Sequence, residues 1–105
     1  MDAQLKKGFL EFCVLASLKN KDSYGYQIVK AVSDYIEISE STLYPILRRL
    51  EASGSVETYT EEHNGRLRKY YKITQKGILS IETFLNEWQE VQAVYDYIKG
   101  EMEHD

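Results

Sequence analysis

Cysteine, proline and long apolar runs are all scarce in this sequence. Cys13 is the only cysteine among the 105 residues, so no disulfide can form within the chain. No apolar run approaches the ~18 residues needed to cross a bilayer. An apolar stretch follows the first lysines, but Glu11 interrupts it and no small-residue cleavage site follows, so we expect no signal peptide. These absences favour a cytoplasmic protein without membrane contact.

Signatures of catalysis and of metal binding are missing as well. The only histidines are His63 and His104, and we expect both to be solvated. The sequence shows no histidine, cysteine and carboxylate cluster with metal-ligand spacing, no glycine-rich phosphate loop and no nucleophile beside an evident base. We therefore expect no enzyme activity, no metal site and no cofactor.

Charge, by contrast, is unevenly distributed along a chain of single-domain length. The formal net charge is −4, but residues 1–77 carry 12 Lys/Arg against 10 Asp/Glu. Residues 78–105 carry one lysine against seven acidic residues, and residues 42–76 carry seven basic against four acidic residues. An acidic chain as a whole argues against a nucleic-acid partner, whereas this distribution describes a mildly basic body followed by an acidic segment.

The first half of the sequence predicts two helices. Residues 4–19 are apolar on every side of a helix, so both faces need a cover. After a polar break, Ser23 is a suitable N-cap for a helix over residues 24–35. Gly25 in its first turn costs about 1 kcal/mol relative to alanine, which indicates a close approach to its backbone.

A third helix and a hairpin follow. Ser39 is a suitable N-cap, and Gly54 a suitable end, for a helix with four leucines and isoleucines at helical spacing. Residues 56–62 and 68–73 predict two strands joined by a turn at His63-Asn64-Gly65-Arg66, because Asn-Gly is a strong hairpin signal. Thr74 is a suitable cap for a last helix over residues 75–102.

The last helix carries a heptad pattern. Its apolar residues recur at alternating spacings of three and four, as in a coiled coil. We expect a helix that extends from a small domain to be unable to bury this seam within its own chain. The seam therefore predicts a homodimer, through Ile81, Phe84, Trp88, Val91, Tyr95, Ile98 and Met102.

Basic and short polar residues gather on the third helix and the hairpin, as DNA binding requires. Short polar or aromatic side chains at the start of a helix suit base edges in the major groove, and arginines one turn later suit phosphates. We expect three cations at the hairpin tip, Arg66, Arg68 and Lys69, to enter or straddle a minor groove. For Lys6 and Lys7 the sequence leaves two interpretations, contact with phosphate and ordinary solvation, of which it favours solvation. The residues expected at DNA are Tyr24, Ser41, Thr42, Tyr44, Arg48, Arg49, Asn64, Arg66, Arg68 and Lys69.

Three segments in this order resemble the PadR family of bacterial transcription regulators. They are Tyr24-Gly25-Tyr26, the third-helix segment 41–51 (STLYPILRRLE) and the hairpin segment 65–77 (GRLRKYYKITQKG). The resemblance covers nearly the whole chain. It implies an α+β fold, mainly α with a β-hairpin wing, in which residues 1–76 form a winged helix-turn-helix and residues 77–105 a dimerisation helix. It also implies repression relieved by a small ligand.

In length the chain resembles the small PadR subgroup with one C-terminal helix, some of whose members sense drugs. Trp88 falls where those members place a ligand-contacting tryptophan. The first-helix positions that would face a small aromatic ligand there are Leu5, Gly8, Phe12 and Leu15. Two interpretations of Trp88 stay open, ligand contact and plain dimer packing, because an aromatic residue in a heptad seam is usually core.

One alternative function uses the same fold. A helix and a hairpin with a few arginines are also typical of a solvated surface, as in a winged-helix module that binds proteins and not DNA. Binding of an inverted-repeat duplex, with an affinity that falls steeply as salt rises, separates the two functions.

Overall fold

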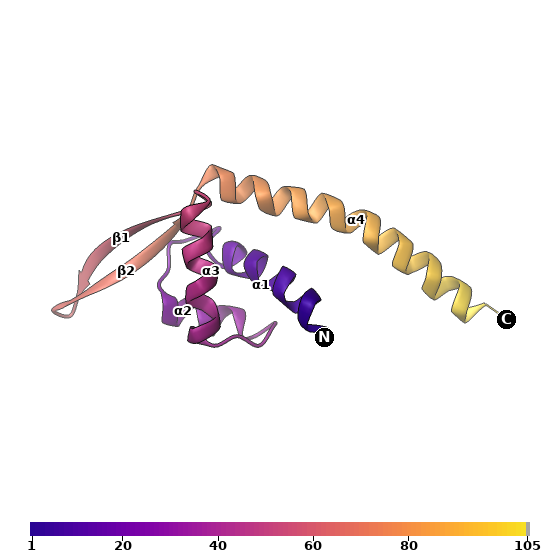
Figure 1. Ribbon diagram of the computed structural model, residues 1–105, viewed down its shortest axis with the longest axis horizontal. Helices are drawn as coiled ribbons and strands as arrows, with labels where there is room; N and C mark the ends of the chain where they lie inside the picture. Colours follow the sequence, from indigo (N-terminus) through magenta and orange to yellow (C-terminus); the bar gives the residue numbers. More distant parts are fainter. Residues whose placement is uncertain (105) are drawn as a thin grey trace.

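The computed structural model describes residues 1–104, so Asp105, the last residue of the expected dimerisation segment 77–105, lies outside the described residues. The elements follow in the order α1 (Ala3–Ser17), α2 (Gly25–Val32), α3 (Glu40–Ala52), β1 (Val56–His63), β2 (Arg66–Ile73) and α4 (Gln75–Glu103). Figure 1 shows α1, α2 and α3 gathered together, with the hairpin and α4 reaching out from them. The expected winged helix-turn-helix with a long C-terminal helix is confirmed.

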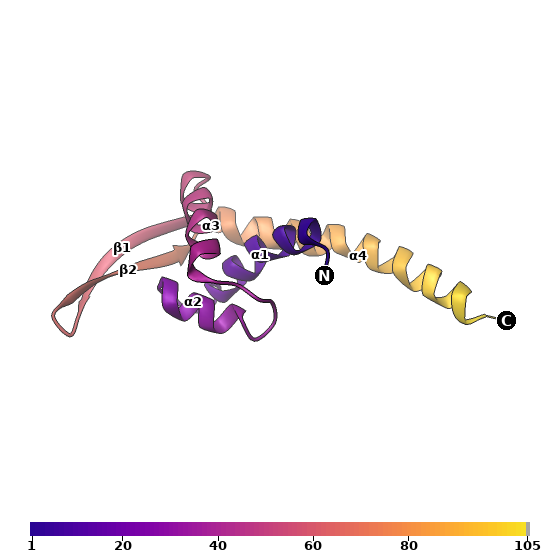
Figure 2. The same ribbon diagram turned by 60° about the horizontal axis from the view of Figure 1, so that its bottom comes forward.

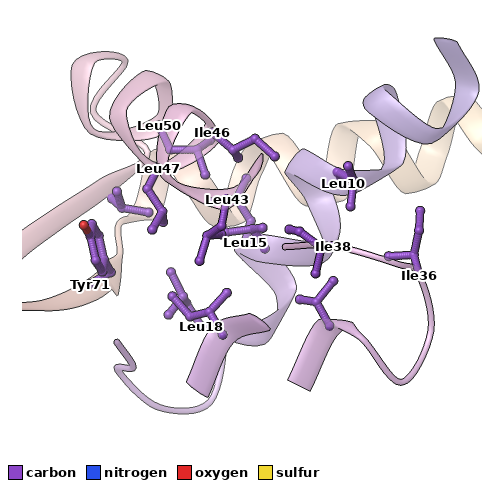
Figure 3. Close-up of a cluster of buried hydrophobic side chains, with 14 residues drawn as sticks. Leu10, Leu15, Leu18, Ile36, Ile38, Leu43, Ile46, Leu47, Leu50 and Tyr71 are labelled. Carbon is purple, nitrogen blue, oxygen red and sulfur yellow. The ribbon is translucent and has the colours of Figure 1, made fainter. Parts of the chain in front are cut away.

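One core joins the three short helices to the root of the hairpin. Figure 3 shows leucines and isoleucines of α1 and α3 meeting Tyr71 of β2. The inner face of α3 is its most buried part, because Leu43, Ile46, Leu47 and Leu50 are each at most 4% exposed. Each such side chain contributes about 1.5–3 kcal/mol on burial. The rotation of α3 about its own axis is therefore fixed by its apolar face.

Helix caps and the turn agree with the sequence at four points. Ser39 Oγ accepts the backbone N–H of Thr42 at 3.3 Å, and Gly54, with φ +80°, ends α3. Thr74 Oγ1 accepts the N–H of Gly77 at 3.2 Å at the start of α4. Asn64 and Gly65 have φ values of 52° and 80°, as a two-residue type I′ hairpin turn requires.

The expected N-cap role of Ser23 is wrong. The N-cap of α2 is Tyr24, without a side-chain capping bond. Ser23 instead exchanges two backbone hydrogen bonds with Tyr71, of 3.2 Å and 2.8 Å, and is itself buried. A serine before a helix can cap the helix or pair its backbone with a strand. Here the pairing with Tyr71 of the distant strand β2 prevails. It attaches β2 to the connection between α1 and α2.

The expectation that the α4 seam is left without cover in its own chain is wrong for its first part. The ring of Phe84 stacks on Phe12 of α1 with centroids 4.2 Å apart, and Trp88 meets Phe9 edge to face at 4.9 Å. Ile81 packs against the core. The reason is that α1 runs alongside the first half of α4, as Figure 2 shows. The rest of the seam is exposed, at Val91, Tyr95, Ile98 and Met102.

Gly77 lets α4 start close to the body of the domain. A Cβ atom at this position would collide with the backbone carbonyl oxygen of Ser55 and lie 2.7 Å from Ile73 Cγ1. Such overpacking costs about 1–3 kcal/mol. We therefore expect Gly77→Ala to lower the free energy of unfolding by this amount in urea denaturation at fixed protein concentration.

The matched control for this variant is Gly100→Ala in the same helix. A Cβ atom at Gly100 meets no heavy atom of residues 1–104 within 4 Å beyond its own helical surroundings. Replacement of a helical glycine by alanine then raises helix stability, by up to about 1 kcal/mol. Equal effects of the two variants would contradict the close approach at Gly77.

Candidate nucleic-acid interface

The outer face of α3 is defined by what its inner face buries. Ser41 and Arg48, seven residues apart, share the stripe that lies opposite the buried leucines, and both are exposed. Thr42 and Arg49 share the neighbouring stripe on the side of α1, because both line a groove between α3 and the first turns of α1. The outer face therefore presents two arginines and two hydroxyls, with Pro45 between them.

Tyr44 lies on the opposite flank of α3, toward α2. A Cβ atom at Gly25 would collide with the Tyr44 hydroxyl, so the expected close approach to the Gly25 backbone is confirmed. The side chain of Tyr44 remains 39% exposed. Tyr44 therefore joins α3 to α2 through its hydroxyl end and still leaves part of its ring on the outer face.

Glu51 lies on the same flank as Tyr44 and faces the hairpin. Its carboxylate accepts a hydrogen bond from Thr58 Oγ1 at 3.0 Å and lies 3.7 Å from Lys69 Nζ. This exposed ion pair adds little stability. The ion pair does, however, hold the negative charge of Glu51 away from the outermost stripe of α3, which stays free of acidic charge.

The expectation of three cations at the hairpin tip is wrong for Lys69, whereas Arg68 stands two residues from Arg66 and lines a hollow at the tip with His63, Asn64 and Arg66. The strands are longer than the sequence indicated, so β2 begins at Arg66 and only Asn64-Gly65 forms the turn. Arg66 and Asn64 do lie at the tip, next to the 77% exposed Leu67. Lys69, by contrast, reaches back toward α3 from the middle of its strand.

Arg68 pairs with Glu61 near the tip end of the hairpin, and its side chain reaches back to the connection between α1 and α2. Its guanidinium carbon lies 3.9 Å from the centroid of the Tyr24 ring, within cation–π range. Tyr24 in turn meets Tyr70 edge to face at 5.6 Å. Tyr24 and Arg68, both expected at DNA, thus hold each other and the strand in place.

A hydrogen bond that the sequence did not indicate also joins the wing to the connection between α1 and α2. Tyr59 of β1 stacks on Tyr70 with centroids 5.5 Å apart, and its hydroxyl donates to Asp22 Oδ2 at 2.7 Å. Asp22 stands 37 residues earlier in the chain, so no local pattern could have revealed the pair. The hydrogen bond, together with desolvation and the charge of Asp22, raises the pKa of Tyr59 to about 12.

The positions expected at a small ligand divide into two groups. Leu5, Gly8, Phe12 and Trp88 line one cavity of about 160 Å³ between α1 and α4, with Gln4, Phe9 and Phe84. The expectation for Leu15 is wrong, because this side chain is 1% exposed within the core and does not reach the cavity. Cavities that hold drug-sized ligands are usually about 300–1,000 Å³, so this cavity is smaller than such a site.

Metal binding and membrane insertion find no support in the described part of the chain. Within residues 1–104 no group of three or more histidine, cysteine or acidic side chains could hold a metal ion. No helix in this range is long and apolar enough to span a bilayer.

Comparison with known proteins identifies the family. The model of the PadR-like family of transcriptional regulators matches residues 14–83, from the middle of α1 to the start of α4. The chain belongs to this family. The three motifs that suggested the resemblance all fall within the matched range, so this interpretation of the sequence is confirmed.

Solved structures of similar proteins share the fold over nearly the full chain. A Streptococcus mutans protein is 40% identical with a TM-score of 0.80 and covers 94% of each chain. A transcriptional regulator from Clostridium thermocellum is 31% identical with a TM-score of 0.82, covering 92% of this chain and 96% of its own. A PadR-like transcriptional regulator from Bacillus cereus is 28% identical, with a TM-score of 0.82 over 98% and 100% of the two chains.

One further structure and one further sequence are similar to this chain. Bacillus subtilis PadR, solved in complex with operator DNA, has a TM-score of 0.69 at 22% identity and covers 73% of this chain and 46% of its own, which shows a shared fold. An uncharacterised protein from Lysinibacillus sphaericus is 35% identical over 95 residues, which make up 86% of this chain and 87% of that protein.

The hydrogen bond between Tyr59 and Asp22 predicts a titration. A raised folded pKa means that the stability from this bond is fully present below the unfolded pKa of 10.0 and is lost as pH rises through about 12. In a spectrophotometric titration we expect Asp22→Ala to return one tyrosine toward its ordinary pKa, and Tyr59→Phe to remove that step. Superimposable curves for the wild type and Asp22→Ala would contradict the bond.

Proposed function

We propose that this chain is a transcriptional repressor that binds inverted-repeat operator DNA as a homodimer. The observation that carries the proposal is the outer face of α3, where Ser41, Thr42, Arg48 and Arg49 are exposed while Glu51 is turned toward Lys69. A helix of this kind, free of acidic charge along its outermost stripe, suits the major groove of a duplex.

Each part of the interface has a distinct role in this proposal. The hydroxyls of Ser41 and Thr42 face base edges near the start of α3, and Arg48 meets phosphate. Arg66 and Asn64 carry the wing tip toward the adjacent minor groove, where a cation is attracted by the concentrated negative potential. The solved complex of Bacillus subtilis PadR with operator DNA supports DNA as the partner of this fold.

The homodimer rests on the distal part of α4. Val91, Tyr95, Ile98 and Met102 continue the heptad seam beyond the reach of α1 and are 45–82% exposed. A seam of this kind is buried when two copies pack together. A two-fold dimer presents two α3 helices to half-sites about 34 Å apart, which is one turn of the duplex.

A small aromatic ligand at the dimer interface would use the cavity between α1 and α4. Trp88 lines this cavity and also packs on Phe9, so contact with a ligand and packing are compatible roles. A second copy that packs against α4 would enlarge and close the site. Because Trp88 is the only tryptophan, its fluorescence reports directly on an occupant.

The first test of the proposal is DNA binding itself. The wild type is expected to retard an inverted-repeat duplex from its own upstream region, with an affinity that falls steeply as salt rises. Arg48→Ala is expected to weaken binding to all duplexes and to lower the salt slope by about one per protomer. Lys30→Ala on α2 removes the same charge away from the interface and is the control.

Two outcomes of this measurement contradict the proposal. If the wild type binds no duplex at low salt, the proposed regulator is refuted and the winged-helix protein-interaction module is left as the alternative. If Arg48→Ala and Lys30→Ala have the same salt slope as the wild type, α3 does not face the phosphates.

The dimer has a separate test in α4. Ile98→Glu places a charge in the exposed seam, and we expect it to shift the mass measured by size-exclusion chromatography with light scattering from dimer to monomer, because an unpaired buried charge is costly. Tyr97→Glu adds the same charge to an exposed residue outside the heptad positions. A dimer that survives Ile98→Glu, or a wild type that is monomeric, would refute this interface.

A further inference from the structure

A groove of about 400 Å³ lies between the first turns of α1 and the flank of α3. Lys6 and Lys7 line it from α1, and Thr42 and Arg49 line it from α3. Leu10 and Pro45 contribute apolar surface, along which the lysine stems can lie. The groove therefore combines an apolar floor with three cationic groups at its margins.

No acidic side chain neutralises these cations. None of the groove-lining residues is acidic, in the chain as described from residue 1 to 104. The ion pairs found in that range are Lys69 with Glu51 and Lys99 with Glu103, so Lys6, Lys7 and Arg49 take part in none. Concentrated and uncompensated positive charge along a groove attracts a polyanion.

The position of the groove indicates which polyanion. Figures 1 and 2 both show the hairpin on one side of α3 and α1 on the other. A helix in the major groove has a sugar–phosphate backbone on each side of it. The wing reaches toward one side, and the groove lies on the other.

We propose that the groove binds the DNA phosphate backbone beside α3, through Lys6, Lys7 and Arg49. The inference rests on the proposed function and extends it to α1, for whose lysines the sequence alone favoured solvation over contact with phosphate. Thr42 and Arg49 make the groove continuous with the outer face of α3. Lysine ammonium groups are compact, mobile point charges, which suit phosphates and read no bases.

The test compares two double variants of the full chain on one duplex. Lys6→Ala/Lys7→Ala is expected to weaken binding to operator and to unrelated duplexes alike, and to lower the salt slope by about 0.9 for each phosphate that is no longer neutralised. Lys6→Arg/Lys7→Arg keeps both charges and is expected to keep the slope. Lys19→Ala/Lys30→Ala removes two exposed charges outside the groove and is the matched control.

Three results would overturn the inference. A Lys6→Ala/Lys7→Ala slope equal to that of the wild type would overturn it alone and leave the proposed function standing. A change in the oligomeric mass of this variant would show that the groove receives a second copy, for instance its acidic α4. A wild type that binds no duplex would overturn the proposed function and the inference together. Because alanine favours helix, we expect circular dichroism to show the same helix content for this variant as for the wild type.

Discussion

Burial of one face of α3 is the constraint on which the rest of the interface depends. Once Leu43, Ile46, Leu47 and Leu50 enter the core, the period of the helix decides where every other side chain on α3 can lie. Arg48 must then face outward, and Arg49 must face α1. Because core packing already sets the rotation of α3, DNA binding does not have to reorient the helix to expose these arginines.

The wing depends on a second set of contacts, which join its strands to the connection between α1 and α2. Arg68 lies over Tyr24, Tyr70 packs between Tyr24 and Tyr59, and Tyr59 is hydrogen bonded to Asp22. These contacts and the bridge from Ser23 fix one end of a two-stranded ribbon that would be marginal in isolation. They therefore set the direction in which the wing leaves the body of the domain.

The parts of the fold that the sequence predicted are those set by local chemistry. Ser39, Gly54, Asn64-Gly65 and Thr74 each act on neighbours within a few residues, and all were placed correctly. The errors share one cause, which is contact between distant segments. Ser23 pairs with a strand that lies far along the chain. The distance of each hairpin cation from the tip depends on the lengths of β1 and β2, and these lengths depend on how the two strands pair.

Leu15 shows the same limit. An apolar residue on a helix that is apolar on every side could face either the core or a ligand, and only the packing of α1 on α2 and α3 decided for the core.

The helix α1 connects two of the sites proposed for this chain, the phosphate groove beside α3 and the cavity beside α4. One side of its first turns carries Lys6 and Lys7 beside α3, and the same turns contribute Leu5 and Gly8 to the cavity with α4. A rigid helix that lines both sites cannot shift at one of them without moving at the other. Any molecule, or second copy, that displaces α1 from α4 would therefore also change where the two lysines meet a phosphate backbone. Such coupling needs two arrangements of α1 with different affinities for DNA, because a ligand that binds both equally shifts nothing. The contacts of Phe12 with Phe84 and of Phe9 with Trp88 define one of these arrangements, and they are the contacts that a ligand in the cavity would have to replace.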